Sequence, residues 1–266
     1  MQSVINDLHF AWKTVILSLI AQIFWIAIVG LVLTNKLDFI IGMILLSLST
    51  YLNFTPMHEA SHGNISGKNK KLKFINSIIG HSSSLSMFIP FTIFKLLHLQ
   101  HHSHTNKPEL DPDYWVATRN PFILFFKIFT IKIGYYFHVF FRPKSSVKNA
   151  RISILYSFSI YYSLIAFVEF YSGKGLIFIS LWFGSAVIAL ALLALVFDWL
   201  PHNPHKKIGR WIDTIIIDKS WLTYPLLYQN YHLCHHLYPR VPFYQYKKLF
   251  IELENEMVTR GSKVIR

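Results

Sequence analysis

Four stretches of the chain are long and apolar enough to cross a lipid bilayer as helices, and they constrain the fold more than any other feature. They contain one charged residue, Glu169, and run over residues 15–34, 39–56, 152–171 and 176–197. A helix needs about 20 residues to cross a hydrocarbon core of ~30 Å, and each stretch is close to that length. The sequence therefore predicts an all-α integral membrane protein with four transmembrane helices.

The first apolar stretch could also be compared with a cleaved signal peptide. It is too long for one, lacks a small-residue cleavage site and leads into another apolar stretch, so we interpret it as the first span. No polar linker or change of composition divides the 266 residues. We therefore expect a single domain over residues 1–266, in which 57–151 and 198–266 form a cap outside the bilayer.

Basic residues predict which side of the membrane the cap occupies. Of the 26 Lys and Arg, 13 lie in residues 68–151 and 10 in residues 206–266, whereas the two short connections hold one each, Lys36 and Lys174. Because Lys and Arg collect in cytoplasmic loops, we expect both termini and the cap, with its active site, on the cytoplasmic side of a bacterial cytoplasmic membrane. Attraction to anionic headgroups is a sufficient reason for the net charge of +13. Nucleic-acid binding is excluded because no soluble module with a basic face is present.

Two further apolar segments are interrupted by polar residues. Residues 121–141 are rich in aromatic side chains but contain Lys127, Lys132 and His138, so we expect a helix that lies in the membrane interface. Residues 74–94 are predicted to form a similar surface or re-entrant segment. If either segment crossed the bilayer, it would put two of the histidine clusters described next on opposite sides.

Three short clusters of histidine indicate metal binding. They are His58-Glu59-Ala60-Ser61-His62, His98-Leu99-Gln100-His101-His102 and His232-Leu233-Cys234-His235-His236. Positions i, i+3 and i+4 of a helix share one face, so each cluster can direct two or three imidazoles toward a common point. Imidazole binds iron, zinc, copper and nickel, and eight rings are too many for one ion. The clusters therefore predict a site that holds more than one metal ion.

The first cluster has an alternative interpretation, because it fits the H-E-x-x-H signature of zinc metalloproteases. An intramembrane zinc protease would leave the other two clusters unexplained. In a polynuclear site, Glu59 would either accept a hydrogen bond from a ligand histidine or be a solvated charge. Cys234 is expected to be a packing residue rather than a ligand, and a single cysteine excludes a disulfide within the chain.

Metal ligation is the simplest explanation of the three closely spaced histidines in the second cluster. Adjacent imidazoles repel one another when protonated and lose hydration when buried neutral, and a metal ion compensates for both effects. His104 lies off the helical spacing and is left out of the ligand set. Asp111 and Asp113 follow in a proline-broken turn, where they either orient ligand histidines or lie in a solvent loop.

A charge appears at the end of the last apolar stretch, in Phe197-Asp198-Trp199-Leu200-Pro201-His202. An ionisable residue at such a position is a functional candidate. We predict that His202 is a ninth ligand and that Asp198 is catalytic: it could bridge a metal-bound water, accept a ligand N–H or cap the helix. Isolated histidines are left out of the set, namely His9, His81, His138 and His205.

These stretches resemble the membrane fatty-acid desaturase and hydroxylase superfamily, over about residues 57–246. The segments HEASH, HLQHHSHTNKPELDPD, FDWLPHNPH and QNYHLCHHLYPRVPFYQY are most similar to the bacterial and cyanobacterial β-carotene ring hydroxylases. The first box is one residue shorter than in acyl-CoA desaturases, and His232 stands where many front-end desaturases have glutamine. Asp198 stands where acyl-CoA desaturases have an asparagine that holds a water.

The resemblance implies four spans and a cytosolic di-iron site. It implies an O2-dependent oxidation of an unactivated C–H bond, which yields a hydroxyl group or a double bond. Hydroxylation of the β-ring of a carotenoid, from β-carotene to a xanthophyll, is the favoured activity, and an acyl-lipid desaturase, a fatty-acyl hydroxylase and a non-enzymatic metal carrier are alternatives. The two iron ions would be held by His58, His62, His98, His101, His102, His202, His232, His235 and His236.

Substrate and electrons are both expected to come from outside the chain. A carotenoid or acyl lipid would enter from the bilayer, and small residues on the last span allow either close helix packing or a slot for it: Gly184, Ser185, Ala186, Ala189, Ala191 and Ala194. The sequence contains no G-x-G-x-x-G, no cysteine set for an iron–sulfur cluster and no haem domain. A separate ferredoxin with its reductase is therefore the expected donor, with a basic dock at Arg240, Lys247 and Lys248.

Overall fold

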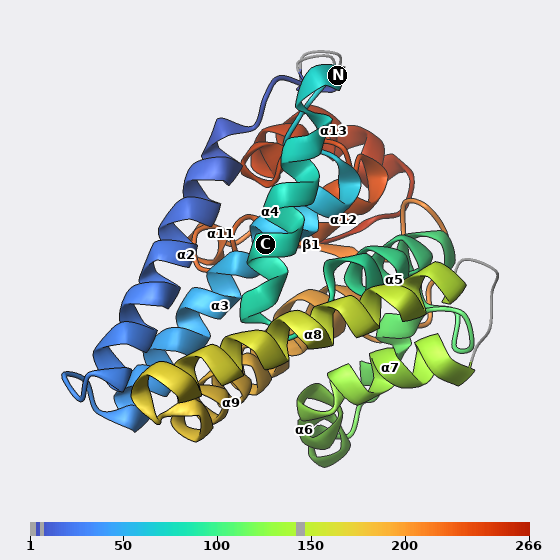
Figure 1. Cartoon of the computed structure of the whole chain (residues 1–266). Coiled ribbons are helices and arrows are strands. Elements are labelled where there is room, and N and C mark those ends of the chain that lie inside the picture. Colours follow the sequence, from blue (N-terminus) through green and yellow to red (C-terminus); the bar gives the residue numbers. More distant parts are fainter. Residues whose placement is uncertain (1–3, 6–7, 142–146) are drawn as a thin grey trace.

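The computed structural model describes residues 4–5, 8–141 and 147–266 (Figure 1). The predicted domain and cap also include residues 1–3, 6–7 and 142–146, which lie outside the described residues. Four helices are long and apolar enough to cross a membrane: Trp12–Leu33 (α2), Phe39–His62 (α3), Ile152–Ser172 within α8 (Val147–Ser172), and Gly175–His202. The prediction of a mostly helical protein with four candidate spans is confirmed.

Helix α3 continues beyond residue 56, where the second span was predicted to end. Asp38 caps its first turn by accepting hydrogen bonds from two backbone N–H groups. Pro56 removes one donor from the helix interior, but the helix continues to His62. It ends at Gly63, whose φ of 74° lies in the left-handed region that favours glycine. The first histidine cluster therefore lies on the last turns of the helix that forms the second candidate span.

The last span also runs further than residue 197. Helix α9 (Gly175–Leu193) passes into a π-helical turn, Ala194–Trp199 (η3), and then into α10 (Leu200–His202). Such turns widen the helix and are frequent at functional sites. Asp198 lies within this turn, so Asp198 and His202 are not one regular α-helical turn apart.

Two bent helix pairs lie between the second and third spans. They are α4 (Lys73–Ser86) with α5 (Phe91–His104), at 101°, and α6 (Pro121–Phe129) with α7 (Ile131–Phe141), at 67°. The single helix predicted over 121–141 is thus two helices, and the segment predicted over 74–94 divides between α4 and α5. If each bent pair were a broken span, the number of spans would be six.

A small parallel sheet corrects the all-α prediction. Strand β1 (Ile215–Ile217) pairs with β2 (Lys263–Ile265), with Ile216 opposite Val264. Three consecutive β-branched residues favour an extended strand, and all three are buried. The sheet fastens the end of the chain, after α13 (Tyr246–Thr259), to the segment that precedes α12 (His232–Leu237).

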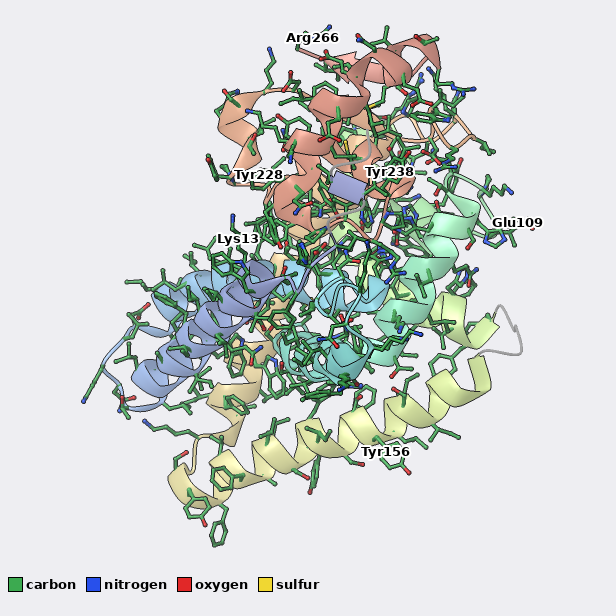
Figure 2. The ribbon with its side chains drawn as sticks, turned by 90° about the horizontal axis from the view of Figure 1, so that it is seen from above. Lys13, Glu109, Tyr156, Tyr228, Tyr238 and Arg266 are labelled. Carbon is green, nitrogen blue, oxygen red and sulfur yellow. The ribbon has the colours of Figure 1, made fainter. Side chains whose placement is uncertain are left out.

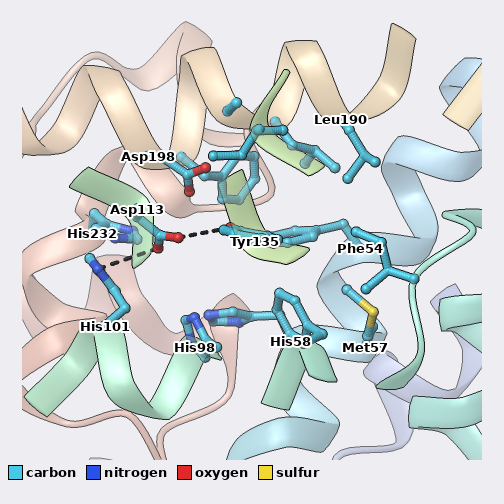
Figure 3. Close-up of a pocket in the computed structure, with 16 residues that line it drawn as sticks. Phe54, Met57, His58, His98, His101, Asp113, Tyr135, Leu190, Asp198 and His232 are labelled. Atoms are coloured by element: carbon cyan, nitrogen blue, oxygen red, sulfur yellow. Dashed lines mark hydrogen bonds and ion pairs between the residues drawn. The ribbon is translucent and has the colours of Figure 1, made fainter. Parts of the chain in front are cut away.

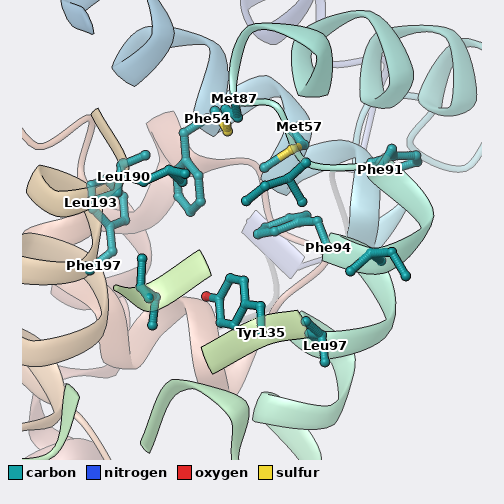
Figure 4. Packing of buried hydrophobic residues seen from close by; sticks show 14 of the residues in the cluster. Phe54, Met57, Met87, Phe91, Phe94, Leu97, Tyr135, Leu190, Leu193 and Phe197 are labelled. Carbon is teal, nitrogen blue, oxygen red and sulfur yellow. The ribbon is translucent and has the colours of Figure 1, made fainter. Parts of the chain in front are cut away.

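The largest cluster of buried apolar side chains lies between α3, α5, α7 and α9 (Figure 4). The ring of Phe54 makes edge-to-face contacts with Phe94, at 5.7 Å between centroids, and with Phe197, at 4.9 Å. His58 follows Phe54 by one turn of α3, and the two rings stack at 5.6 Å. The apolar core therefore continues directly into the histidine clusters.

Helix α8 covers one side of the molecule and exposes most of its apolar surface. Leu155 is 69% exposed and Phe170 is 82% exposed. Tyr156 points away from the molecule in Figure 2. Apolar side chains exposed in such number along one helix are typical of a surface that faces lipid.

Candidate metal centre

All nine histidines that were predicted as ligands come together at one place. Their rings lie within contact distance of one another across different elements, with centroids 4.5 Å apart for His58 and His98 and 5.1 Å apart for His202 and His236. The end of α3 supplies two of them, α5 three, α10 one and α12 three. Elements that are far apart in the sequence thus build one cluster.

The nine rings form two groups around separate centres. Two sets of four each offer one ring nitrogen per residue within 4.8 Å of the others: His58, His62, His98 and His235, and His101, His202, His232 and His236. His102 adjoins the first set, because its Nε2 lies 2.8 Å from the Nε2 of His235 and 3.2 Å from that of His98. Five imidazoles therefore surround one centre and four surround the other.

Each H-x-x-H-H cluster contributes to both centres. On α5, His98 and His102 face the first centre and His101 faces the second. On α12 the assignment is reversed: His235 faces the first centre, and the other two histidines face the second. Residues i+3 and i+4 of a cluster lie about 100° apart around the helix, so adjacent histidines project toward neighbouring points. One short helix can thus hold two centres side by side.

The distances between ring nitrogens fit metal coordination. With metal–nitrogen distances of about 2.1 Å, neighbouring ligand nitrogens are expected about 3.0–3.4 Å apart. The Nε2 atoms of His58 and His235 are 3.0 Å apart, and those of His232 and His236 are 3.2 Å apart. Both ring nitrogens of His202 are buried without a hydrogen-bond partner among the described residues, which is costly unless a metal ion binds one of them. The residues fit two ions of the kind that imidazole prefers.

Two buried carboxylates hold the ring of His101. Its Nδ1–H donates to Asp111 Oδ1 at 2.8 Å and lies 3.3 Å from Asp113 Oδ2. Asp111 also accepts hydrogen bonds from the backbone N–H groups of Asn106 and Asp113. Donation from Nδ1 fixes the tautomer that leaves the Nε2 lone pair for a metal. The predicted contact of these carboxylates with a histidine of the second cluster is confirmed, and the alternative of a solvent loop is wrong because both are buried.

The histidines of α12 have similar partners on the side away from the centres. His232 Nδ1–H donates to Gln229 Oε1 at 3.0 Å, and His235 Nδ1–H donates to the Tyr246 hydroxyl at 3.0 Å. That hydroxyl donates in turn to Glu59 Oε1 at 3.5 Å. Glu59 is fully buried, so the alternative of a solvated charge is wrong.

Burial keeps the histidines of α12 neutral. It lowers the pKa of His232 to about 3, and the nearby His101 lowers it further. Burial and then repulsion from neighbouring imidazoles hold the pKa of His235 and the pKa of His236 well below the usual range. A metal ligand must be the neutral ring, so these residues are in the binding form at neutral pH.

A small pocket with mainly apolar walls lies beside the histidines (Figure 3). Residues of α3, α5, α7, α9 and η3 form its walls, among them Met57, Leu190 and Phe197. Tyr135 lies in the pocket, and its hydroxyl donates to Asp113 Oδ1 at 2.8 Å. Four of the nine histidines line the polar end: His58, His98, His101 and His232.

Asp198 also lines this pocket, next to Asp113 in Figure 3, and the π-helical turn carries it there. Its catalytic role stays a prediction. Of the two purposes that the sequence allowed for the small residues of the last span, close helix packing is confirmed and a slot for substrate stays a prediction. A Cβ on Gly184 would lie 3.0 Å from the Met43 sulfur, so the two helices pack closely there, whereas Ala194 lines the pocket.

The histidines that the sequence analysis left out belong to neither metal group of the described residues: His9, His81, His104, His138 and His205. His138 is nevertheless buried and bonds Gln100, and His205 stacks on His202 at 6.0 Å. Cys234 is fully buried in an apolar cluster, which agrees with the predicted packing role.

Three residues of the site were missed in the sequence. Gln229 precedes His232 by three residues, and this helical spacing was a usable signal for a hydrogen-bond partner. Tyr135 and Tyr246 gave no such signal, because each reaches the site only through the packing of a helix distant in sequence.

Residues 35–265 match the sequence profile of the family described as fatty acid desaturase. Three relatives show weaker similarity. A zeaxanthin 4-ketolase of Chlamydomonas reinhardtii is 34% identical over 62 residues, which is 23% of this chain. An sn-1 oleoyl-lipid 12-desaturase of Anabaena variabilis is 21% identical over 225 residues, which is 74% of this chain. A protein of the same description from Synechocystis sp. is 34% identical over 58 residues, or 22% of this chain. The alignments cover 13%, 63% and 15% of these proteins' own lengths, so the chain spans less than two thirds of each.

Proposed function

Since the chain belongs to the fatty acid desaturase family, we propose that it is a membrane oxidoreductase that uses two iron ions and O2 to oxidise an unactivated C–H bond of a lipid-soluble substrate. The observation that carries this proposal is the pair of histidine groups beside an apolar pocket. The recognition of the superfamily from its histidine boxes is confirmed by the match to residues 35–265.

Five histidines would hold one iron and four the other, with His102 in the larger set. When bound, the iron pair supplies the reduction of O2 that makes attack on a C–H bond possible. The protein's own task is to place the substrate and to exclude water. Asp111 and Gln229 keep two ligand rings in one orientation. Asp198 lines the pocket next to Asp113, where it would hold a water or accept a proton.

The pocket favours a hydrocarbon without charge at the reacting end. Its apolar walls include Phe54, Met57, Ile89, Phe94, Leu190, Leu193 and Phe197. Burying such a surface against hydrocarbon is favourable by about 25 cal/mol per Å², whereas a charged headgroup would lose its hydration there. The substrate would therefore enter with its apolar end from the bilayer.

We favour hydroxylation of the β-ring of a carotenoid over desaturation of an acyl lipid. The support is the resemblance of four segments to β-carotene ring hydroxylases, together with the local similarity to a ketolase whose description names a xanthophyll. The alternative, an acyl-lipid desaturase or fatty-acyl hydroxylase, is supported by the longer but weaker similarity to the Anabaena protein. Both reactions begin with removal of hydrogen from an unactivated carbon.

A zinc protease is less well supported. The H-E-x-x-H reading requires Glu59 to face a metal-bound water. Its Oε1 instead accepts from Asn64 and Tyr246, away from both histidine groups. A metal carrier would have the same histidines but would consume no O2 when supplied with a reductant.

For the whole protein we propose one membrane domain in a bacterial cytoplasmic membrane, with the histidines on the cytoplasmic side. The charge distribution supports this orientation, because 23 of the 26 Lys and Arg lie in the two cap segments. The electron donor would be a ferredoxin with its reductase.

Expression in a bacterium that accumulates β-carotene tests the substrate. Hydroxylated pigment, detected by chromatography and mass spectrometry, is the expected product. Unchanged pigment with newly unsaturated fatty acids would favour the alternative. The oxygenase assignment would be overturned if pigment and lipids were both unchanged and the iron-loaded protein consumed no O2 with reduced ferredoxin.

A further inference from the structure

The histidine cluster has a second face that is polar and distinct from the apolar pocket. A surface cleft is lined by His102 and His236 together with Ser103, Thr105, Lys107, Ile208, Gly209, Arg210 and Asp213. The apolar pocket is lined by four other histidines, and none of the nine lines both. Both His102 and His236 are partly exposed, whereas most of the other ligand candidates are buried. The histidine cluster therefore borders an apolar pocket through four of its histidines and a polar surface cleft through two others.

Positive charge surrounds this cleft. Arg210 and Lys107 line it, and the exposed Lys206 and Lys207 come directly before Ile208 in its wall. The carboxylate in the cleft is that of Asp213, which is only partly exposed. Four cations against one carboxylate give a local field that attracts acidic surfaces.

The loop that carries Lys206, Lys207 and Arg210, called the cationic loop below, is held in place by hydrogen bonds. The Asn106 side-chain amide donates to the backbone carbonyls of Lys207 and Asp213, at 2.8 and 2.7 Å. The guanidinium of Arg210 donates to the Leu237 carbonyl at 3.4 Å and lies 5.8 Å from the ring of Tyr238. A pre-ordered surface loses little conformational entropy when a partner binds.

A short chain of hydrogen bonds connects the cationic loop to the metal centre through Asn106 and Asp111. The backbone N–H of Asn106 donates to Asp111 Oδ2 at 2.7 Å, and Asp111 accepts from His101. A partner that rests on the loop therefore lies against the centre itself, with His102 and His236 at the bottom of the contact.

Hydroxylation requires reducing equivalents: RH + O2 + 2 e⁻ + 2 H⁺ gives ROH + H2O. The sequence holds no motif for a flavin, a nicotinamide, a haem or an iron–sulfur cluster. From this need and the geometry we infer that the cleft is the docking surface for an acidic one-electron donor protein, which delivers its electrons beside His102 and His236. The inference rests on the proposed function and moves the predicted dock away from Arg240, Lys247 and Lys248.

Charge reversal tests the surface directly. The variant Lys206→Glu/Lys207→Glu/Arg210→Glu leaves all nine histidines in place. We expect it to weaken binding of oxidised plant-type [2Fe–2S] ferredoxin to the full chain in nanodiscs by about tenfold or more at low salt, with a smaller salt dependence than the wild type. Fluorescence anisotropy measures this affinity without turnover, and the KM for ferredoxin in the iron-loaded enzyme should rise in parallel.

Two matched variants keep the outcome specific. Lys70→Glu/Lys71→Glu reverses two exposed charges at another site and should bind ferredoxin like the wild type. Arg240→Glu/Lys247→Glu/Lys248→Glu tests the dock expected from sequence. Unchanged affinity in the cleft variant, or an equal loss in either comparison variant, would overturn the inference. A wild type that binds ferredoxin at the cleft but oxidises nothing would refute the proposed function and leave the docking surface standing.

Discussion

His101 is the residue at which the metal centre, the apolar pocket and the buried carboxylates meet. Removing its ring in His101→Ala would leave one centre with three imidazoles and would leave Asp111 and Asp113 without their shared partner. We expect product to fall below detection and bound iron to fall from about two ions per chain toward one, as measured by elemental analysis.

His104→Ala is the matched control for this change. His104 lies on the same helix, three residues further on, but belongs to neither metal group of the described chain. Its Nδ1 contacts the Gln100 carbonyl at 3.2 Å, a bond within the last turn. Iron content and activity should stay near the wild-type values. Full activity in His101→Ala would contradict the ligand assignment.

The Tyr246 hydroxyl joins His235 to Glu59, so Tyr246→Phe removes one hydrogen-bond partner while the ring keeps its packing. Outer partners of metal ligands typically contribute about 10–100-fold to metal affinity or activity. We expect iron to be lost to a chelator faster by a factor in this range, with a lower melting temperature as well, because the buried His235 Nδ1–H and Glu59 each lose a partner. Equal rates of iron loss in variant and wild type would show that the hydroxyl does not position His235.

At the scale of residues, the sequence allows the clustered histidines and the carboxylates beside His101 to be predicted, but not the partners that come from distant helices. Histidines recur at fixed spacings within one helix, and helical geometry is local. The division of His98, His101 and His102 between two centres depends on where α12 packs, which no local pattern encodes. The partners Tyr135 and Tyr246 come from distant helices for the same reason.

Among the elements, α7 depends on a close contact that glycine permits. A Cβ on Gly134 would lie 2.6 Å from the Trp115 ring. Gly134→Ala should force this ring or the helix to move, which overpacks the core and costs about 1–3 kcal/mol. A fall in melting temperature of about 2–4 °C per kcal/mol is the expected result in detergent.

Gly30→Ala provides the comparison, because a Cβ there would meet no atom within 4 Å. Alanine is also favoured over glycine inside a helix, so the melting temperature of this variant should be unchanged or higher. If the two variants melted alike, the contact between α7 and Trp115 would not limit stability.

The sequence predicted that the four long helices exist, but not the residues at which they end. The four apolar stretches indicate four helices because hydrophobic length is a property of the sequence alone. The second apolar stretch ends at Pro56, whereas helix α3 continues to His62 and is capped by Gly63. The π turn before Asp198 and the β1–β2 pairing likewise depend on contacts made elsewhere in the chain.

At the scale of the molecule, the two faces of the metal centre explain why the spans are arranged as they are. Figure 1 shows α2 and α8 diverging from the end where the Lys36 turn lies toward the end that holds α5 and α12. The histidine cluster fills this wider end. The apolar pocket lies between the spans, and the charged cleft lies on the far side of the histidines. On the proposed assignments, the substrate and the electron donor would therefore not compete for one surface.

The number of spans stays a prediction that labelling can test. The Nε2 atoms of His62 and His98 are 2.8 Å apart, so the end of α3 and the middle of α5 lie side by side. If α4 and α5 together crossed the bilayer, Lys71 and Glu109 would lie on opposite sides of it. The native Cys234 is fully buried and should react slowly with maleimide, so single added cysteines can report the side of each turn.

We expect a membrane-impermeant maleimide to label Lys36→Cys in intact bacterial cells. Lys71→Cys and Glu109→Cys, at exposed positions, should be labelled only after the cells are broken, because four spans place both in the cytoplasm. The unsubstituted chain gives the background from Cys234. Labelling of Lys71→Cys and Glu109→Cys from opposite sides would require a fifth crossing between them, and labelling of both from outside would reverse the orientation of the metal centre.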